Sequence, residues 1–254
     1  MYKIQPKTLF TGKKIKYLST CHSTNDIAVE MIQSEAVSEG TVVITDKQTA
    51  GRGQRGNTWL ATEKQNLTFS LIWKPTFLKA SQQFQLNVAI SLGVFDFLRE
   101  YIDEGLAVKW SNDLYFWNQK MGGILIENTL QGYSIEYSVI GIGLNINQLE
   151  FNLPTATSLR KVTGNPQQYD LSDCLCKLLE HLEKNYVLLK EGYYETLKAR
   201  YLTHLFRYQE WHEYRIDGHI QLGQILGIDE HGRLALETSD GLNYYGFKEI
   251  EFII

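Results

Sequence analysis

The sequence contains few cysteines, few prolines and no long apolar run, and each of these absences excludes a class of protein. Its three cysteines, Cys21, Cys174 and Cys176, are too few and too unevenly spaced for a disulfide framework or a zinc site. No apolar run approaches the ~18 residues of a membrane span, and the lysine-containing N-terminus lacks the apolar core of a signal peptide. We therefore expect reduced thiols, a cytoplasmic location and no membrane partner.

The chain also lacks an excess of positive charge. Its 25 basic and 29 acidic residues give a net charge of −4, which argues against a broadly basic nucleic-acid-binding protein. Only four prolines are present, so a proline-rich linker protein is excluded as well. Hydrophobic residues make up 43% of the 254 residues, which is enough for a sizeable core in one large domain, or in one large and one small domain.

Hydrophobic periodicity predicts a chain that mixes strands and helices. A short amphipathic helix is expected to open at Ser23, whose hydroxyl suits an N-cap. From 212 to the end, glycines separate short apolar segments, which is typical of a small β-barrel and places the domains at 1–208 and 209–254. Further strands are predicted at 14–19, 41–46, 67–74, 106–110, 113–117, 121–127 and 133–145, and further helices at 82–102, 171–190 and 192–206.

The segment from Gly51 to Gly56 has the spacing G-x-G-x-x-G. A dinucleotide-binding loop would need a helix at the third glycine, but a polar stretch leads from there into the next strand. No Gly-Lys-Ser/Thr follows, so the loop is not a Walker loop. Flexible glycines, the cations Arg52 and Arg55 and the flat ring of Trp59 instead predict a mobile loop that folds over an anionic, aromatic ligand such as a nucleotide. A solvated hairpin tip is the alternative.

One predicted strand, 140–147, has a bare face. Because side chains alternate across a sheet, one face carries only Ile and Leu, and the other carries Gly141, Gly143, Asn145 and Asn147. Two missing side chains leave a floor on which a ligand can lie, and the two amides can hydrogen-bond it. A bulge or a tight strand crossing is the alternative explanation.

Two further segments place cations beside small or polar residues. Lys120 precedes Gly122 and Gly123 at the start of an apolar strand, and the segment 109–113 combines a lysine, an amide and a carboxylate. A single lysine at a turn is usually only solvated, and a single Asn-Asp pair usually marks a turn. Three segments of this kind in one domain favour a binding site.

Taken together, these segments resemble those of the biotin protein ligases, which attach biotin to a lysine of a carrier protein. The C-terminal region, with 227–229 and 231–232, is similar to the small SH3-like domain of that family. One motif alone would carry little weight, but the ordered set is specific. The matching segments occur in the family's order: 23–25, 48–56 with Trp59, 109–113, 120–125, 141–147 and 156–159.

The resemblance implies a fold and a two-step reaction. The implied fold is α+β: a mixed β-sheet with flanking helices, related to class II aminoacyl-tRNA synthetases and lipoate ligases, followed by the SH3-like β-barrel. The implied substrates are ATP and biotin, with Mg²⁺ on the triphosphate. The enzyme would form biotinyl-5'-AMP and pass biotin to a biotin carboxyl carrier protein of acetyl-CoA carboxylase or of another biotin-dependent carboxylase. No residue is expected to be a metal ligand.

The resemblance also implies roles for individual residues. Lys120, Arg52 and Asp113 would be catalytic: Lys120 bridges the biotin carboxylate and the α-phosphate, and Asp113 orients the incoming amine. Trp59 would cover the adenine. The residues implied to bind ATP are Arg55, Trp59, Lys109, Asn112 and Asn145. Those implied to bind biotin are Ser23, Thr24, Asn25, Gln48, Gly51, Arg52, Gly53, Gln54, Lys120, Gly122 and Gly123.

The sequence departs from the family pattern at three positions. Gln54 replaces a common arginine, so we expect weaker retention of the adenylate unless Arg55 compensates. Ser111 replaces a common proline, which loosens a turn but removes no chemical group. Lys248 replaces a common glycine, and we expect this change to matter little.

Some members of the family carry an N-terminal DNA-binding domain. Because Ser23 already belongs to the implied site, the preceding residues cannot hold such a domain, and we expect no nucleic-acid partner. A homodimer is compatible with the resemblance. The alternatives in function are a lipoate or octanoate protein ligase or transferase of the same fold, a non-catalytic biotin or nucleotide sensor, and a dinucleotide-dependent oxidoreductase.

Overall fold

The structure, a computed structural model, describes residues 4–34 and 36–254, and the side chain of Arg55 lies outside the described part. Its centre is a seven-stranded mixed sheet with the order β1-β2-β3-β7-β6-β5-β4. β1 and β2 pair in parallel, and the other neighbours in this sheet pair antiparallel. The strands are β1 (Ile15–Cys21), β2 (Thr41–Gln48), β3 (Leu67–Trp73), β4 (Leu106–Lys109), β5 (Asp113–Phe116), β6 (Gln119–Gln131) and β7 (Ser134–Leu144).

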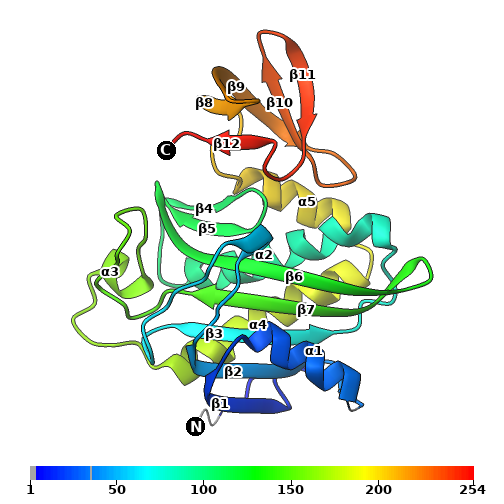
Figure 1. Cartoon of the computed structure of the whole chain (residues 1–254), viewed down its shortest axis with the longest axis vertical. Coiled ribbons are helices and arrows are strands. Elements are labelled where there is room, and N and C mark those ends of the chain that lie inside the picture. The colour runs from blue at the N-terminus through cyan, green and yellow to red at the C-terminus, as the bar shows by residue number, and fades with distance from the viewer. Residues whose placement is uncertain (1–3, 35) are drawn as a thin grey trace.

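Helices cover both faces of this sheet (Figure 1). On one face, α1 (Thr24–Ser34) packs against β2, β3 and β7, and on the other face α2 (Gln83–Arg99) packs against α4 (Leu171–Lys190). α5 (Tyr194–Thr203) contacts both α2 and α4 and leads to the second sheet. No helix in the described residues combines the length and the apolar character needed to cross a membrane. The short helical segments are η1 (Gln54–Gly56), η2 (Ala80–Gln82) and α3 (Leu159–Thr163).

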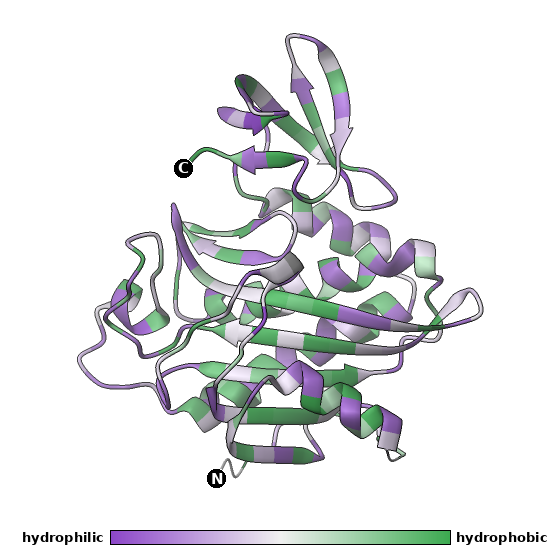
Figure 2. Cartoon of the chain, viewed as in Figure 1, coloured by the Kyte–Doolittle hydropathy of each residue, from purple (hydrophilic) through white to green (hydrophobic). Residues whose placement is uncertain are grey.

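The main core lies between the large sheet and the helices α2 and α4. All seven residues of β3 are buried, because this strand is covered on both faces. Ile140, Ile142 and Leu144 of β7 face the core as predicted, and the indole of Trp73 stacks on the ring of Tyr186 with centroids 4.1 Å apart. Figure 2 shows apolar residues along the central strands and many polar residues on α1 and in the loops. The opposite face of β7 is therefore free to build a site.

The C-terminal region forms a five-stranded antiparallel sheet with the order β11-β10-β9-β8-β12, so β11 and β12 are its edges. Buried Tyr214, Ile225 and Leu236 belong to the same hydrophobic cluster as the core of the large sheet. The division into domains at residue 208 stays a prediction. The strands are β8 (Trp211–Ile216), β9 (His219–Ile228), β10 (Leu234–Thr238), β11 (Gly241–Tyr245) and β12 (Ile250–Phe252).

The α+β fold with a mixed sheet, flanking helices and a C-terminal β region is confirmed. The predicted N-cap is also present, because the Ser23 hydroxyl oxygen accepts a hydrogen bond from the Asp26 amide at 3.4 Å. Gly56 ends the single turn η1, and no helix lies between 57 and 66, so the chain lacks the helix that a dinucleotide loop requires. The three cysteines are free, and burial raises the pKa of the Cys174 thiol to about 12.

Candidate active site

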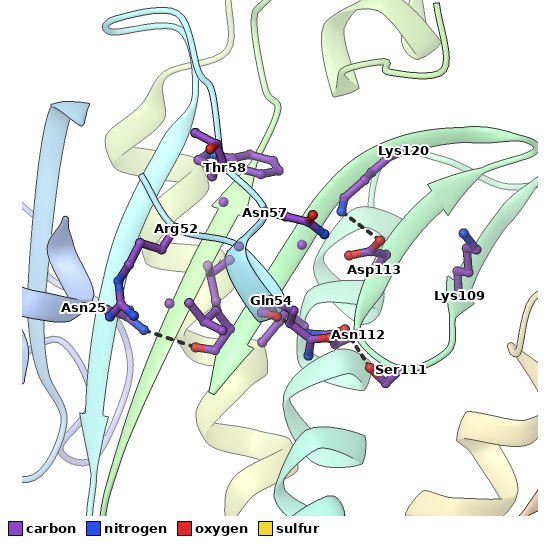
Figure 3. Close-up of a pocket in the computed structure, with 18 of the residues that line it drawn as sticks. Asn25, Arg52, Gln54, Asn57, Thr58, Lys109, Ser111, Asn112, Asp113 and Lys120 are labelled. Atoms are coloured by element: carbon purple, nitrogen blue, oxygen red, sulfur yellow. Dashed lines mark hydrogen bonds and ion pairs between the residues drawn. The ribbon is translucent and has the colours of Figure 1, made fainter. Parts of the chain in front are cut away.

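A cavity of about 630 Å³ lies between the bare face of the large sheet, the loop 51–59 and the C-terminal segment 247–252. Figure 3 shows that side chains from several elements converge on it. Thirteen of the residues implied by the family resemblance are in its lining: Ser23, Thr24, Asn25, Gln48, Arg52, Gly53, Gln54, Trp59, Lys109, Asn112, Asp113, Lys120 and Gly123.

The floor of the cavity is the glycine face of β7. Gly141 and Gly143 pair with Ser70 and Thr68 of β3 on one side, and with Leu125 and Gly123 of β6 on the other. A Cβ added to Gly141 would collide with the Asn25 amide, and one added to Gly143 would collide with the indole of Trp59. The two glycines are therefore needed for close approach, and the groups that approach them are Asn25 and Trp59. That a ligand lies on this face of the strand stays a prediction.

One end of the cavity is built from uncharged hydrogen-bonding groups. The Gln48 side-chain oxygen accepts hydrogen bonds from the Thr24 amide at 2.8 Å and from its hydroxyl at 3.2 Å. Ser70 Oγ lies 2.7 Å from Thr24 Oγ1 and 2.5 Å from Asn25 Oδ1. Thr24, Asn25 and Ser70 are buried, so this network is rigid and holds its members at fixed positions. Sequence reasoning found Thr24, Asn25 and Gln48 but missed Ser70, which is the link between them.

The other end of the cavity carries an ion pair. Lys120 Nζ, at the start of β6, lies 2.7 Å from Asp113 Oδ2 on β5, and Figure 3 shows both side chains in the cavity. A Cβ at Gly123 would lie 3.1 Å from Asp113 Oδ1 and 3.3 Å from Lys120 Nζ, so the glycine leaves room for the pair. The predicted lysine, carboxylate and glycine are thus brought together. The Asn112 amide beside them is engaged within the protein, by the Ile124 carbonyl and by the Ser111 hydroxyl at 2.8 Å.

Lys109 is a second cation at this end. Its ammonium lies 4.9 Å from the ring centroids of both Tyr115 and Phe252 and 3.4 Å from the Tyr115 hydroxyl oxygen. Burial lowers the pKa of Lys109 from its ordinary value of 10.5, and the negative charge of Asp113 opposes this shift. An anion that entered the cavity would favour the charged form of Lys109.

The loop 51–59 forms one wall of the cavity. Arg52 from this loop forms ion pairs with Asp26 and Glu127, and the hydrogen bonds that its guanidinium donates to Glu127 are the largest cause of its raised pKa. Gln54 Oε1 and Trp59 Nε1 are buried without a hydrogen-bond partner within the protein. Such atoms are rare in folded proteins, and both residues line the cavity, so a ligand is a natural partner for them. Arg55 was predicted to bind ATP, and its side chain lies outside the part of the chain that the structure describes.

Three implied residues are not part of the cavity lining. A Cβ on Gly122 would meet Leu144 Cδ1 at 2.8 Å, so this glycine serves packing on the core side of the sheet. Gly51 packs against the Trp59 carbonyl within the loop. Asn145 donates its side-chain amide to the Thr157 carbonyl at 3.0 Å. The predicted contacts of these three residues with the ligands stay predictions.

Sequence reasoning missed the contribution of the C-terminal region to the cavity. Its lining includes Phe247, Lys248, Ile250, Glu251 and Phe252, from β12 and the turn before it. Lys248 has a φ of 74°, a conformation that favours glycine. In the sequence, the departure from glycine at Lys248 was the one signal that pointed to a contribution of the C-terminal region. We therefore revise the expectation that Lys248 matters little.

Comparisons with known proteins show the family to which the chain is related. A model of the biotin/lipoate A/B protein ligase family matches residues 17–145, slightly more than half of the chain. The bifunctional ligase/repressor BirA of Bacillus subtilis is 29% identical over 262 residues, which cover 96% of this chain and 76% of that protein. The biotin–[acetyl-CoA-carboxylase] ligase of Mycobacterium tuberculosis is 28% identical over 239 residues, which cover 89% of this chain and 84% of that protein.

The fold is likewise similar to solved structures. The biotin protein ligase from Aquifex aeolicus in complex with biotin and ATP superposes with a TM-score of 0.78 and 28% identity, over 95% of this chain and 99% of that chain. A structure of the Leishmania major enzyme in complex with biotin, at 21% identity, has a TM-score of 0.66 and covers 93% of this chain and 99% of that chain, which supports the fold. The chain belongs to the biotin/lipoate A/B protein ligase family.

Proposed function

We propose that the protein is an ATP-dependent biotin protein ligase. The observation that carries this function is one cavity with two different ends. One end presents the uncharged groups of Thr24 and Gln48 beside the paired Arg52, and the other holds Lys109 and the ion pair of Lys120 with Asp113. Biotin has a polar, uncharged ureido ring at one end and a carboxylate at the other, and it fits this polarity. The relatives named as biotin ligases and the structural relative solved with biotin and ATP support the same reaction.

In this proposal, the ring of biotin lies beside Asn25 and Gly141 in the cavity and is bound by Ser23, Thr24, Asn25 and Gln48. The buried network of these residues fixes their donors and acceptors before the ligand arrives. Such preorganised groups give specificity, because a ring without matching hydrogen bonds would leave them unpaired.

The carboxylate then points toward Lys120, and the nucleotide occupies the space near Trp59 and Lys109. An oxygen of the biotin carboxylate attacks the α-phosphorus, the bond to the β-phosphate oxygen breaks, and pyrophosphate leaves. Lys120 and Lys109 offset the repulsion between the two anions, and their field is strong in a partly buried site. Mg²⁺ on the triphosphate would supply further positive charge, held by phosphate oxygens and by carboxylates of the kind that Asp113 and Glu251 place in the lining.

In the second step, the amine of a carrier lysine attacks the acyl carbon of biotinyl-5'-AMP and AMP leaves. Asp113 is the carboxylate available to orient the amine and to take up its proton. Asp113 forms an ion pair with Lys120, so the carboxylate that orients the amine lies next to the cation that bridges carboxylate and α-phosphate. The acceptor is a biotin carboxyl carrier protein or domain, as the names of relatives that act on acetyl-CoA carboxylase suggest. A cytoplasmic location, a homodimer and the absence of a nucleic-acid partner stay predictions.

The decisive experiment is mass spectrometry of a biotin carrier domain after incubation with the protein, ATP and biotin. We expect one biotin on one lysine, and biotin-dependent exchange of labelled pyrophosphate into ATP. Lys120→Ala should fold normally and lose at least about a thousandfold in exchange rate, since it removes a charge that acts on the reacting groups. Lys161→Ala, which removes a lysine outside the cavity lining, is the control.

Two other outcomes would overturn this proposal. Exchange of labelled pyrophosphate into ATP that occurs with lipoate or octanoate but not with biotin would favour the lipoate-type alternative within the same family. Binding of biotin and ATP without pyrophosphate exchange, and without AMP release in the presence of an acceptor, would favour a sensor.

A further inference from the structure

The guanidinium of Arg52 is held by two carboxylates from outside its own loop. Arg52 Nη2 lies 2.6 Å from Asp26 Oδ1 of α1, and 2.8 Å from Glu127 Oε2 of β6. Arg52 Nη1 lies 3.0 Å from Glu127 Oε1, so the contact with Glu127 is bidentate. A bidentate pair of this kind fixes both position and orientation, because the two planar groups match each other.

This arrangement leaves Arg52 without surplus positive charge. One cation lies between two anions, and the group of three residues carries a net charge of −1. If Arg52 turned toward a bound phosphate, both carboxylates would lose their ion pair with the guanidinium. Among the described residues, the cavity lining also holds the cations Lys109, Lys120 and Lys248, and Lys120 pairs with the carboxylate of Asp113.

We propose that Asp26 and Glu127 are positioning residues that fasten Arg52 and thereby hold the loop 51–59 over the cavity. In this arrangement the side chain of Arg52 acts as an anchor, and the ligand is contacted by Gly53, Gln54 and Trp59 of the same loop. The proposal rests on the proposed function only for the identity of the ligand, because the anchor itself is formed within the protein.

The anchor is connected to the uncharged end of the cavity. Glu127 Oε2 also accepts a hydrogen bond from the Asn25 side-chain amide at 2.7 Å, and Figure 3 shows Asn25 and Arg52 side by side. The Asn25 oxygen in turn lies 2.5 Å from Ser70 Oγ. A ligand bound to this network therefore contacts the residues that hold Glu127, and through Glu127 the loop. Binding at the uncharged end and closure of the loop are coupled through shared side chains.

The first experiment needs no ligand. Trypsin cleaves after arginine, so the rate of cleavage after Arg52 and Arg55 in the native protein reports how often the loop opens. Glu127→Gln should raise this rate about tenfold, the size expected when a charge-assisted hydrogen bond is lost, and Asp26→Asn should raise it less. Glu100→Gln is the matched control: its side chain is 35% exposed like that of Glu127, it pairs with Lys177 at 2.8 Å, and it lies outside the cavity lining.

The second experiment measures the dissociation rate of biotin. If Arg52 is an anchor, Glu127→Gln speeds dissociation about tenfold, and the double variant with Arg52→Gln is no faster than either single variant. If Arg52 instead binds the ligand directly, Glu127→Gln frees the cation and slows dissociation, which would overturn the proposal. An unchanged cleavage rate in Glu127→Gln would overturn it as well, whichever ligand the protein uses. Failure of biotin to bind the unaltered protein would count against the proposed function, and the cleavage assay would still test the anchor.

Discussion

At the scale of single residues, Gln54 is the position where a small change should alter the reaction most selectively. It lies in the cavity wall with its side-chain oxygen buried and unpaired. We expect Gln54→Arg to slow the release of biotinyl-5'-AMP about tenfold, because a guanidinium there could form a charge-assisted bond with the phosphate. Rapid dilution into unlabelled ligand would measure the release rate. Gln54→Met, which matches the size but has neither a charge nor a hydrogen-bonding group, should not slow the release.

Lys109 gives the site a dependence on pH. Its pKa is lowered in the folded protein, so the ammonium destabilises the fold at lower pH, and this cost decreases as the pH rises from the lowered pKa to the ordinary value of 10.5. A bound anion favours the ammonium, so ATP binding is coupled to proton uptake in the same range. We expect the affinity for ATP to fall as the pH rises above the lowered pKa, by at most about tenfold per pH unit for one proton.

Titrations of ATP binding between neutral and alkaline pH would check this behaviour. Lys109→Arg keeps the charge throughout the range, so it should flatten the profile. A profile that keeps its slope in that variant would assign the titration to another group.

At the scale of secondary structure elements, β6 and β7 use neighbouring glycines for opposite purposes. A side chain at Gly143 would displace the Trp59 ring from the cavity floor, whereas one at Gly122 would press on Leu144 in the core. We expect Gly143→Ala to weaken ATP binding about tenfold with little change in stability, because the loop that carries Trp59 can move away. Gly122→Ala should reduce the free energy of unfolding by about 1–3 kcal/mol, the usual cost of overpacking, and leave binding nearly intact. Thermal unfolding and calorimetric titration of both variants would test the contrast.

The elements also show how much of this protein was predictable from its sequence. Period-two and helical patterns located β2, β3 and α2 because those elements bury continuous apolar surface. The glycine face of β7 was predictable from alternation alone. The partners of Arg52 were not, because Glu127 is 75 residues away and only the pairing of the sheet brings it near. The backbone hydrogen bond of Asn145 was not predictable either, because a polar residue at a strand end bonds the backbone as readily as a ligand.

At the scale of the whole molecule, the cavity is completed by the second sheet. Lys248 lies in the turn before β12 and lines the cavity with a positive φ. We expect Lys248→Gly to weaken ATP binding several-fold through the lost charge. The free energy of unfolding should stay within about 1 kcal/mol, because relief of the left-handed conformation offsets the greater freedom of the unfolded chain.

A second residue of the C-terminal region also has a positive φ and provides a control for the substitution by glycine. Asp217 has a φ of 49° in the turn between β8 and β9 and is not part of the cavity lining. Asp217→Gly should therefore leave ATP binding unchanged. Equal binding by both variants and by the unaltered protein would show that the second sheet contributes shape but no charge.

The contact between the Trp59 indole and Gly143 also has an optical consequence. Trp59 and Trp110 are the tryptophans in the cavity lining, whereas Trp117 and Trp211 are 62% and 50% exposed. A ligand that meets the unpaired indole nitrogen, or stacks on the ring, would change its emission, so the protein carries its own fluorophore for rapid-mixing kinetics. Trp59→Phe should remove that signal and identify its source, and the order in which the two substrates arrive could then be followed without any label.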